Sequence, residues 1–338
     1  MTSIRKSVAA AGLGLGLVLA AGSALAQQTG IVDPGRQVYY DAFKGKKVSI
    51  LVATMGLDLS QAWVATARRE LEPLGVQLNV RDYSWKADVG AQALGTMIGE
   101  KPDVMVVHNV DVTSFAKLIQ RAENEGIPVI QLNTKAVYSS SAYVGVDWTA
   151  IGEAAAQTLV KACGAGTSQK IAVMQGAVTD PASTYQLRGV NNILEKHPDI
   201  KVVSNQAADW DSSKAYAITT TVLRQNPDLC GITGFWDGMD VGIGNAVRDA
   251  KPAKPVLVVS SGGGANSACE NLSKGIFSHY VSFDAPAQGH DLASAIKTVL
   301  QQKQKAGTAK FYLYSKLTVL DKDAKADACW DLNNYKQS

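Results

Sequence analysis

The stretch Gly126-Ile-Pro-Val-Ile-Gln-Leu-Asn-Thr134 decides how the rest of the chain is interpreted. Residues 127–132 form a short apolar run that opens at a Gly-Ile-Pro sequence, and such a run predicts a strand buried within a parallel sheet. Asn133 and Thr134 follow directly, so they stand at the carboxyl end of that strand, where open α/β sheets bind their ligands. We therefore expect these two residues to form one wall of a binding site.

The same alternation of strand-like and helix-like segments precedes this stretch and continues beyond it. In the first half we expect strands at 48–53, 76–83, 104–108, 127–132 and 143–146, and helices at 59–74, 87–99 and 112–124. In the second half we expect strands at 170–175, 201–206, 231–235, 256–261, 276–283 and 311–319, and helices at 150–161, 184–196, 212–225, 241–249 and 286–302. The pattern predicts an α/β protein with two doubly wound parallel-sheet lobes and a cleft between the carboxyl ends of their strands. Residues 27–45 carry no strong pattern and are expected to form an extension of the first domain.

The amino-terminal residues predict export. Arg5 and Lys6 precede an apolar run at residues 8–21, and Ala24-Leu-Ala26 is typical of a signal-peptide cleavage site. We therefore expect residues 1–26 to be a signal peptide cleaved after Ala26 and the mature protein to lie in the periplasm. The alternative is a retained membrane anchor.

Composition excludes several classes of protein. The 33 basic and 30 acidic residues become almost balanced once Arg5 and Lys6 are removed, because residues 1–26 contain no acidic residue. A near-neutral chain gives no electrostatic reason to expect a nucleic-acid partner. The roughly 310 remaining residues exceed one ordinary core and favour two domains.

The chain has four cysteines, which fit two disulfides in an oxidising compartment with three possible connectivities. Cys163 and Cys230 each precede a predicted strand, and because strand starts share one edge of a parallel sheet, we expect these two to pair. Cys269 and Cys329 would then pair with each other; the alternative is four free thiols. No histidine or cysteine spacing indicates a metal site, and we expect no cofactor.

Several segments together resemble the type I periplasmic sugar-binding proteins, the ribose-binding-protein-like receptors of ABC transporters. The segments are Lys47-Val-Ser-Ile-Leu-Val-Ala-Thr54, Lys101-Pro-Asp-Val-Met-Val-Val-His108, Gly126-Ile-Pro-Val-Ile-Gln-Leu-Asn133, Ala207-Ala-Asp-Trp-Asp211 and Asn226-Pro-Asp228 with the strand after it. The resemblance runs from about residue 48 to residue 320. It implies two hinged lobes that close on a sugar or polyol, a membrane ABC permease as partner, and a monomer without enzymatic activity.

The resemblance also implies where the chain crosses between lobes. The hinge crossings fall near residues 145–148, 281–284 and 313–315, with Asp147, Trp148 and Ser315 as hinge residues. The amino-terminal lobe then holds residues 27–147 and 284–313, and the carboxyl-terminal lobe holds residues 148–283 and 314–338.

Ligand-binding residues can be carried over by position. In the first loop Thr54, Asp58, Leu59 and Trp63 are candidates, and the sequence does not decide which of the last three faces the cleft. Asn133-Thr134 replaces an aspartate–arginine pair of the family, Gln186 stands where an arginine is frequent, and Trp236 stands where asparagine is usual. The remaining candidates are Trp210, Asp237, Ser261, Gly262, Phe283 and Asp284.

The candidate residues fit the chemistry of a neutral sugar or polyol. Flat aromatic rings pack on the C–H faces of a sugar, and amides, carboxylates and hydroxyls bind its edge. An anionic ligand would need basic residues, for which Lys135 and Arg188 are the candidates. Several of these residues could have structural roles instead of contacting a ligand. Trp63, Trp85 and Trp148 could pack in the protein interior, and His108 and Asp111 could stabilise a turn. Asp237 could cap the helix that follows it.

Other readings of the function are weaker. Gly262-Gly-Gly264 lacks the lysine of a phosphate-binding loop and predicts a tight turn. Ser260 and Ser261 lie outside a nucleophile-elbow pattern, and no catalytic constellation emerges. The alternatives to a transport receptor are a ligand sensor for a membrane chemoreceptor or kinase, a receptor for another small polar solute, and an exported enzyme.

Overall fold

The computed structural model describes residues 33–336, so the predicted signal peptide lies outside the described residues. Helix α2 (Pro34–Asp41) forms a unit separate from residues 43–338. It begins at Pro34 because the Asp33 carboxylate accepts a hydrogen bond from the Gly35 N–H at 2.9 Å. This helix was not predicted from the sequence.

The first sheet has six parallel strands in the order β11-β5-β4-β3-β1-β2. They are β1 (Lys47–Val52), β2 (Gln77–Asp82), β3 (Val104–Val107), β4 (Val129–Asn133), β5 (Ala142–Gly145) and β11 (Phe311–Tyr314). Every residue of β3, β4 and β5 is buried, as expected of central strands covered on both faces.

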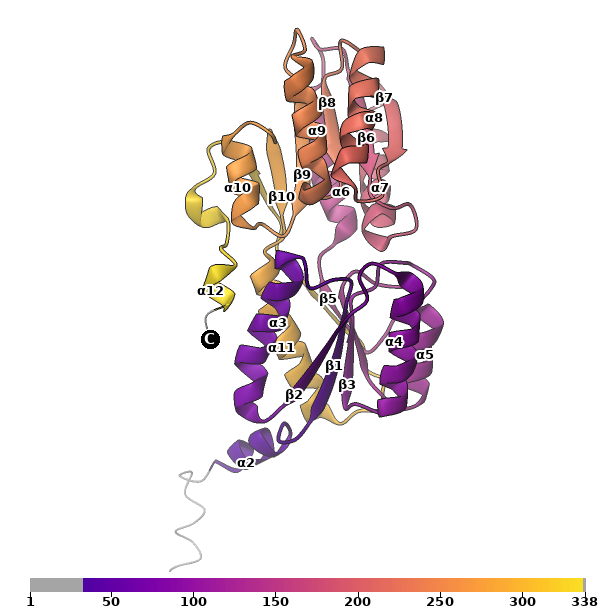
Figure 1. Cartoon of the computed structure of the whole chain (residues 1–338), viewed down its shortest axis with the longest axis vertical. Coiled ribbons are helices and arrows are strands. Elements are labelled where there is room, and N and C mark those ends of the chain that lie inside the picture. Colours follow the sequence, from indigo (N-terminus) through magenta and orange to yellow (C-terminus); the bar gives the residue numbers. More distant parts are fainter. Residues whose placement is uncertain (1–32, 337–338) are drawn as a thin grey trace, which may run out of the picture. The chain divides into compact units, whose positions relative to one another are not determined.

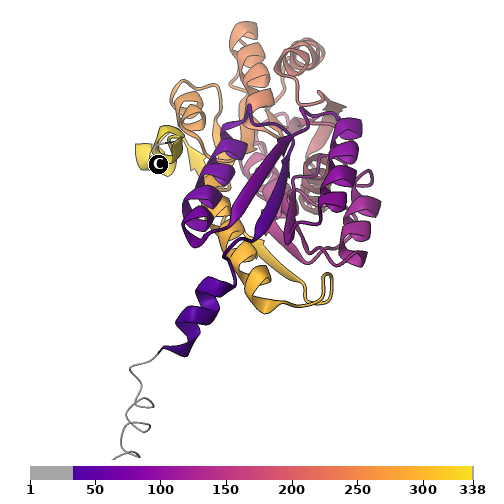
Figure 2. The same ribbon diagram turned by 60° about the horizontal axis from the view of Figure 1, so that its bottom comes forward.

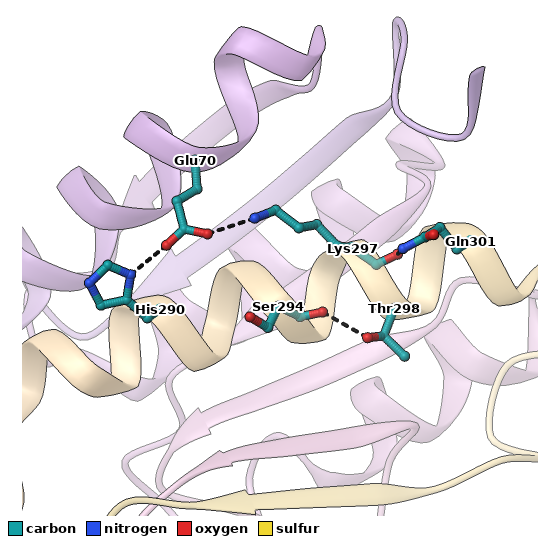
Figure 3. A network of polar contacts seen from close by, with 6 residues as sticks. All are labelled: Glu70, His290, Ser294, Lys297, Thr298 and Gln301. Atoms are coloured by element: carbon teal, nitrogen blue, oxygen red, sulfur yellow. Dashed lines mark hydrogen bonds and ion pairs between the residues drawn. The ribbon is translucent and has the colours of Figure 1, made fainter. Parts of the chain in front are cut away.

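Helices cover both faces of this sheet. Helix α3 (Asp58–Leu71) with the short helix η2 (Glu72–Leu74) and helix α11 (Ala285–Gln302) lie on one face, and α4 (Ala87–Glu100) and α5 (Ala116–Asn124) lie on the other (Figure 1, Figure 2). On the first face Glu70 of α3 joins two residues of α11. Its carboxylate accepts from Lys297 Nζ at 2.6 Å and contacts His290 Nδ1 at 2.5 Å (Figure 3). Residues separated by more than two hundred positions therefore anchor α11 to the first lobe.

The second sheet has the order β12-β10-β9-β8-β6-β7 and is parallel except for the antiparallel pair of β10 and β12. Its strands are β6 (Lys170–Gln175), β7 (Lys201–Ala207), β8 (Gly231–Gly234), β9 (Leu257–Gly262), β10 (His279–Ser282) and β12 (Thr318–Asp321). Its helices are α6 (Trp148–Ala162), α7 (Pro181–Leu194), α8 (Ser212–Gln225), α9 (Asp237–Ala250) and α10 (Asn266–Ser273). The predicted fold class, two doubly wound parallel-sheet lobes, is confirmed.

The chain passes between the two sheets three times. It crosses after β5, after β10 and between β11 and β12. The predicted strand at 311–319 is wrong as a single strand, because Ser315 interrupts it: the Ser315 N–H donates to Gly145 O at 2.7 Å, and the chain then joins the other sheet.

Two disulfides lie in the second lobe, and they join Cys163 to Cys230 and Cys269 to Cys329, the pairs expected from the sequence. The second one holds the carboxyl-terminal tail, which contains η3 (Ala326–Ala328) and α12 (Asn333–Lys336), against α10. The tail also reaches the first lobe, where the Arg69 guanidinium of α3 lies 5.7 Å from the ring centre of Tyr335. Within residues 33–336, no helix has both the length and the apolar character needed to cross a membrane.

Candidate functional site

A cavity lies where the carboxyl ends of the two sheets face each other, and residues of both lobes line it. We call it the central cavity. The residues that line it are Leu57, Leu59, Trp85, His108, Asn133, Thr134, Trp148, Asp180, Ala182, Trp210, Phe235, Trp236, Gly262 and Phe283. These residues stand at the ends of strands or in the segments that follow them, because parallel strands bring their carboxyl ends to one edge of a sheet.

Aromatic rings form the walls of the central cavity. Trp210 and Trp236 of the second lobe meet edge to face, with ring centres 6.2 Å apart. Trp148 and Phe283, at two of the crossings, meet in the same way at 5.4 Å. Such rings supply flat apolar surfaces at a low entropic cost because they have few rotatable bonds.

Two glycines make room for the tryptophans of the second lobe. A Cβ atom added to Gly176 would lie 2.2 Å from the Trp210 ring, and one added to Gly238 would lie 2.5 Å from the Trp236 ring. Both distances are below any real contact, so a larger residue at either position would displace a ring that lines the cavity.

Asn133 and Trp148 are linked at the first crossing. Asn133 has a positive φ of 62°, a conformation that asparagine tolerates better than most residues. Its backbone oxygen accepts from Trp148 Nε1 and from the Tyr143 hydroxyl, each at 2.6 Å. Its side-chain Oδ1 is buried without a hydrogen-bond partner in the described residues, which leaves one acceptor on the wall of the central cavity.

Asp180 belongs to the second lobe and lines the central cavity opposite the first lobe. It is a functional candidate that was not predicted from the sequence. It caps α7, accepting from the Ala182 N–H at 2.7 Å, and it lines the central cavity together with Trp210. It is only 3% exposed, and this burial raises its pKa to about 7, with a further contribution from the charge of Asp111. The signal that could have found it is the Asp-Pro pair between a strand and a helix, at the edge where the ligand binds.

His108 supplies a neutral imidazole. Burial lowers its pKa to about 4, so the ring is uncharged at neutral pH. Its Nδ1 accepts from the Ala53 N–H at 3.5 Å, which leaves Nε2 as the protonated nitrogen. A turn role was the favoured reading of this residue, whereas the structure puts it on the cavity wall.

Two further cavities flank the central one and share residues with it. One is bordered by Trp85, Asp111, Asp180, Asp209 and Asp211, and the other by Asp58, Leu59, Asp237, Phe283 and Trp330. Trp236 borders all three. Within the described residues, neither Lys135 nor Arg188 lines any of these three cavities.

Lys135, one of the two basic candidates, is engaged elsewhere. Its Nζ lies 4.9 Å from the ring centre of Tyr143, 5.5 Å from that of Tyr314 and 5.7 Å from that of Tyr185. Since Tyr185 belongs to α7, this lysine contacts both lobes. A backbone hydrogen bond from Val112 N to Thr179 O, at 3.0 Å, also joins the lobes directly.

The family model described as periplasmic binding protein domain matches residues 44–304. The chain belongs to this family. The D-allose-binding periplasmic protein of Escherichia coli is 30% identical over 153 residues, which are 43% of this chain and 49% of that protein, so this match spans about half of that relative. The D-apiose import binding protein of Actinobacillus succinogenes is 22% identical over 243 residues, which cover 71% of this chain and 73% of that protein.

Solved structures show the same fold. A periplasmic solute-binding protein from Actinobacillus succinogenes, crystallised with D-allose, is 25% identical with a TM-score of 0.69 and covers 82% of this chain and 98% of that one. The suspected resemblance to periplasmic sugar-binding proteins is thereby confirmed.

In this periplasmic binding protein, most of the site residues expected from the sequence lie together. Eight of them line the central cavity: Leu59, Asn133, Thr134, Trp148, Trp210, Trp236, Gly262 and Phe283. Asp58 and Asp237 border the flanking cavity. Asp237 begins α9, four residues before the predicted start of that helix, and accepts from the Tyr280 hydroxyl at 2.8 Å. Burial raises its pKa to about 6.

The other expected residues lie outside the cavity walls. Trp63 is fully buried in the core, where its Nε1 donates to Gln288 Oε1 at 3.0 Å. Gln186 and Ser261 are hydrogen-bonded to each other and to Phe235 O, behind the wall.

Thr54, Asp147 and Asp284 shape the backbone around the binding protein's cleft. Thr54 Oγ1, in the first loop, donates to the carboxylate of Asp82, the last residue of β2, at 3.2 Å. Asp147 and Asp284 cap α6 and α11, so each fixes the helix that follows a crossing.

Proposed function

We propose that the chain is a periplasmic receptor that closes on a neutral sugar or polyol and delivers it to a membrane ABC permease. The observation that carries the proposal is the central cavity, which combines aromatic walls with the polar groups of Asn133, His108 and Asp180 and draws on both lobes. A ligand that touches both lobes stabilises the closed arrangement by its differential affinity for that arrangement.

The lobes that move in this proposal are residues 27–147 with 284–313 and residues 148–283 with 314–338. Asp147, Trp148 and Ser315 would absorb the change in backbone angles. The anchoring of α11 through Glu70 supports assigning residues 284–313 to the first lobe.

The proposed ligand contacts are the eight cavity residues named above, with Asp58, Asp237, Asp180 and His108 at its ends. Thr54, Trp63, Gln186, Ser261 and Asp284 would act by holding these residues in place. We further propose export with cleavage after Ala26, a monomeric state, and release of the ligand without chemical change.

Isothermal titration calorimetry of the mature protein against a panel of pentoses, hexoses and linear polyols tests the proposal. Saturable binding of a member of the panel, with recovery of unchanged ligand, is the expected result. Binding confined to amino acids or nucleosides would contradict it. A variant with Trp210→Ala should lose binding, whereas Tyr216→Ala, on the exposed part of α8, should keep it.

A further inference from the structure

The polar groups of the central cavity are largely engaged within the protein. The Trp148 N–H donates to Asn133 O, and one oxygen of the Asp180 carboxyl accepts from the Ala182 N–H. The Thr134 hydroxyl donates to Asn109 O. Among the described lining side chains, few hydrogen-bonding groups therefore remain for a ligand.

The polar side chains directly behind the cavity wall, Gln186 and Ser261, are also hydrogen-bonded within the protein. Gln186 donates from Nε2 to Phe235 O at 3.0 Å and accepts from the Ser261 hydroxyl at 3.1 Å. Both residues are buried, with exposures of 1%. Turning either side chain toward the cavity would break the hydrogen bond between the two side chains and remove one of the two donors to Phe235 O, at a cost comparable to a lost hydrogen bond.

The groups that remain for a ligand are an acceptor on Asn133, the carboxyl of Asp180, the His108 N–H and the indole N–H groups of Trp85 and Trp236. An intact hexose carries a hydroxyl on nearly every carbon, and each hydroxyl both donates and accepts. A hydroxyl pressed against an aromatic ring loses its hydration and gains no partner there.

We infer that the central cavity selects a deoxygenated sugar, which lacks one or more hydroxyl groups of its parent and turns the resulting apolar patch to the tryptophan wall formed by Trp210 and Trp236. This inference rests on the proposed sugar-receptor function and narrows it. Asn133 of the first lobe and Asp180 of the second lobe hold the hydroxyls that the ligand keeps, so the same contacts that orient the ligand bridge the lobes.

The test compares dissociation constants within pairs of sugars of the same configuration: fucose with galactose, rhamnose with mannose, and deoxyribose with ribose. For at least one pair the deoxygenated member should bind about tenfold to hundredfold more tightly, the range expected when an apolar pocket meets an added hydroxyl. Equal or tighter binding of the parent sugars would overturn the inference and leave the receptor function standing. Binding of a linear polyol with no binding of any pair would overturn the inference alone, and binding of no sugar or polyol at all would overturn both.

Substitutions at Trp236 test the inference independently of the sugar pairs. Trp236→Asn places an amide in the wall and should reduce the preference for the deoxygenated sugar several-fold, whereas Trp236→Phe retains the apolar wall and should keep the preference. An unchanged preference in a folded Trp236→Asn protein would contradict the role of this wall. The comparison of sugar pairs on the unmodified protein decides the inference if Trp236→Asn does not fold.

Discussion

The indole Nε1 of Trp148 donates a hydrogen bond to the backbone oxygen of Asn133 at 2.6 Å, and this bond joins the first residue of α6 to the last residue of β4. It spans the first crossing between the lobes and fixes the backbone of a residue that lines the central cavity. The hinge and the binding site therefore share one contact.

Trp148→Phe keeps an aromatic ring and removes this donor. We expect the free energy of unfolding to fall by about 1 kcal/mol, the usual net contribution of a hydrogen bond, and the affinity for the ligand to fall several-fold. Urea unfolding and calorimetry measure the two effects. The control is Tyr216→Phe, which removes an exposed hydrogen bond to Asp249 and should change neither. Unchanged affinity in Trp148→Phe would contradict the link between hinge and site.

Gly176→Ala should weaken ligand binding by tenfold or more, because the added methyl group would lie 2.2 Å from the Trp210 ring and displace it. Titration calorimetry measures the loss, and circular dichroism checks that the fold is kept. Gly95→Ala is the matched control, since no atom lies within 4 Å of a Cβ at that helical position. It should leave binding unchanged and stabilise α4 slightly, as alanine is the better helix former. Equal affinity of the two variants would refute the role of Gly176.

Asp180→Asn should alter the dependence of stability on pH. Burial raises the pKa of Asp180 to about 7 from an ordinary value of 3.8, so between these values the folded chain holds a proton that the unfolded chain has released. This carboxyl therefore contributes an unfolding free energy that falls as the pH rises from about 4 to about 7. Asparagine cannot titrate, so the variant should gain stability relative to the unmodified protein across this window.

Asp111→Asn is a second variant for that experiment, and because the charge of Asp111 helps to raise the pKa of Asp180, this change should also move the Asp180 window to lower pH. Burial alone would raise the pKa of Asp111, but hydrogen bonds from the N–H groups of Ser114 and Thr113 hold it at about 2. The stability it contributes is present above its unfolded pKa and is lost only as the pH falls below about 4. Urea unfolding between pH 4 and pH 8 compares the variants, and parallel profiles for Asp180→Asn and the unmodified protein would contradict the prediction.

Glu70→Gln should reduce the unfolding free energy by about 1 kcal/mol at neutral pH, the upper end for partly exposed ion pairs, and leave ligand affinity unchanged. Although burial alone would raise the pKa of Glu70, the hydrogen bonds from Lys297 and His290 hold it below its ordinary value (Figure 3). The stabilisation therefore disappears as the pH falls through the pKa of the folded state. Glu125→Gln, in the exposed pair with Arg121, is the control and should have little effect. Equal losses in the two variants would argue against a special role for the Glu70 cluster.

The alternation of strands and helices was predictable, because buried parallel strands and amphipathic helices leave periodic patterns in the sequence. The role of Trp63 could not be predicted from the sequence. It shares a helix face with Ala67 and is fully buried, and its partner Gln288 is 225 residues away. Local periodicity cannot separate a core tryptophan from one that faces a cleft, since both lie on the apolar side of a helix.

Asp180 is a second case in which the local sequence does not reveal the role of a residue. A helix cap and a ligand acceptor have the same local sequence, and only the approach of Trp210 and the first lobe distinguishes them. The run 311–319 was misread because aromatic and aliphatic residues lie on both sides of Ser315-Lys316, while the hydrogen-bond partners change from β5 to β10.

The position of β11 has a consequence for the order in which the protein is made. Its partner β5 ends at Gly145, but β11 itself begins at Phe311, so the edge of the first sheet is supplied by a segment that leaves the ribosome far later. Helix α11, which covers that sheet, is also synthesised after the whole of β6 to β10. The amino-terminal lobe begins first but cannot be completed before β11 has been made, so a nascent chain remains without a finished amino-terminal lobe until almost all of it has been translated.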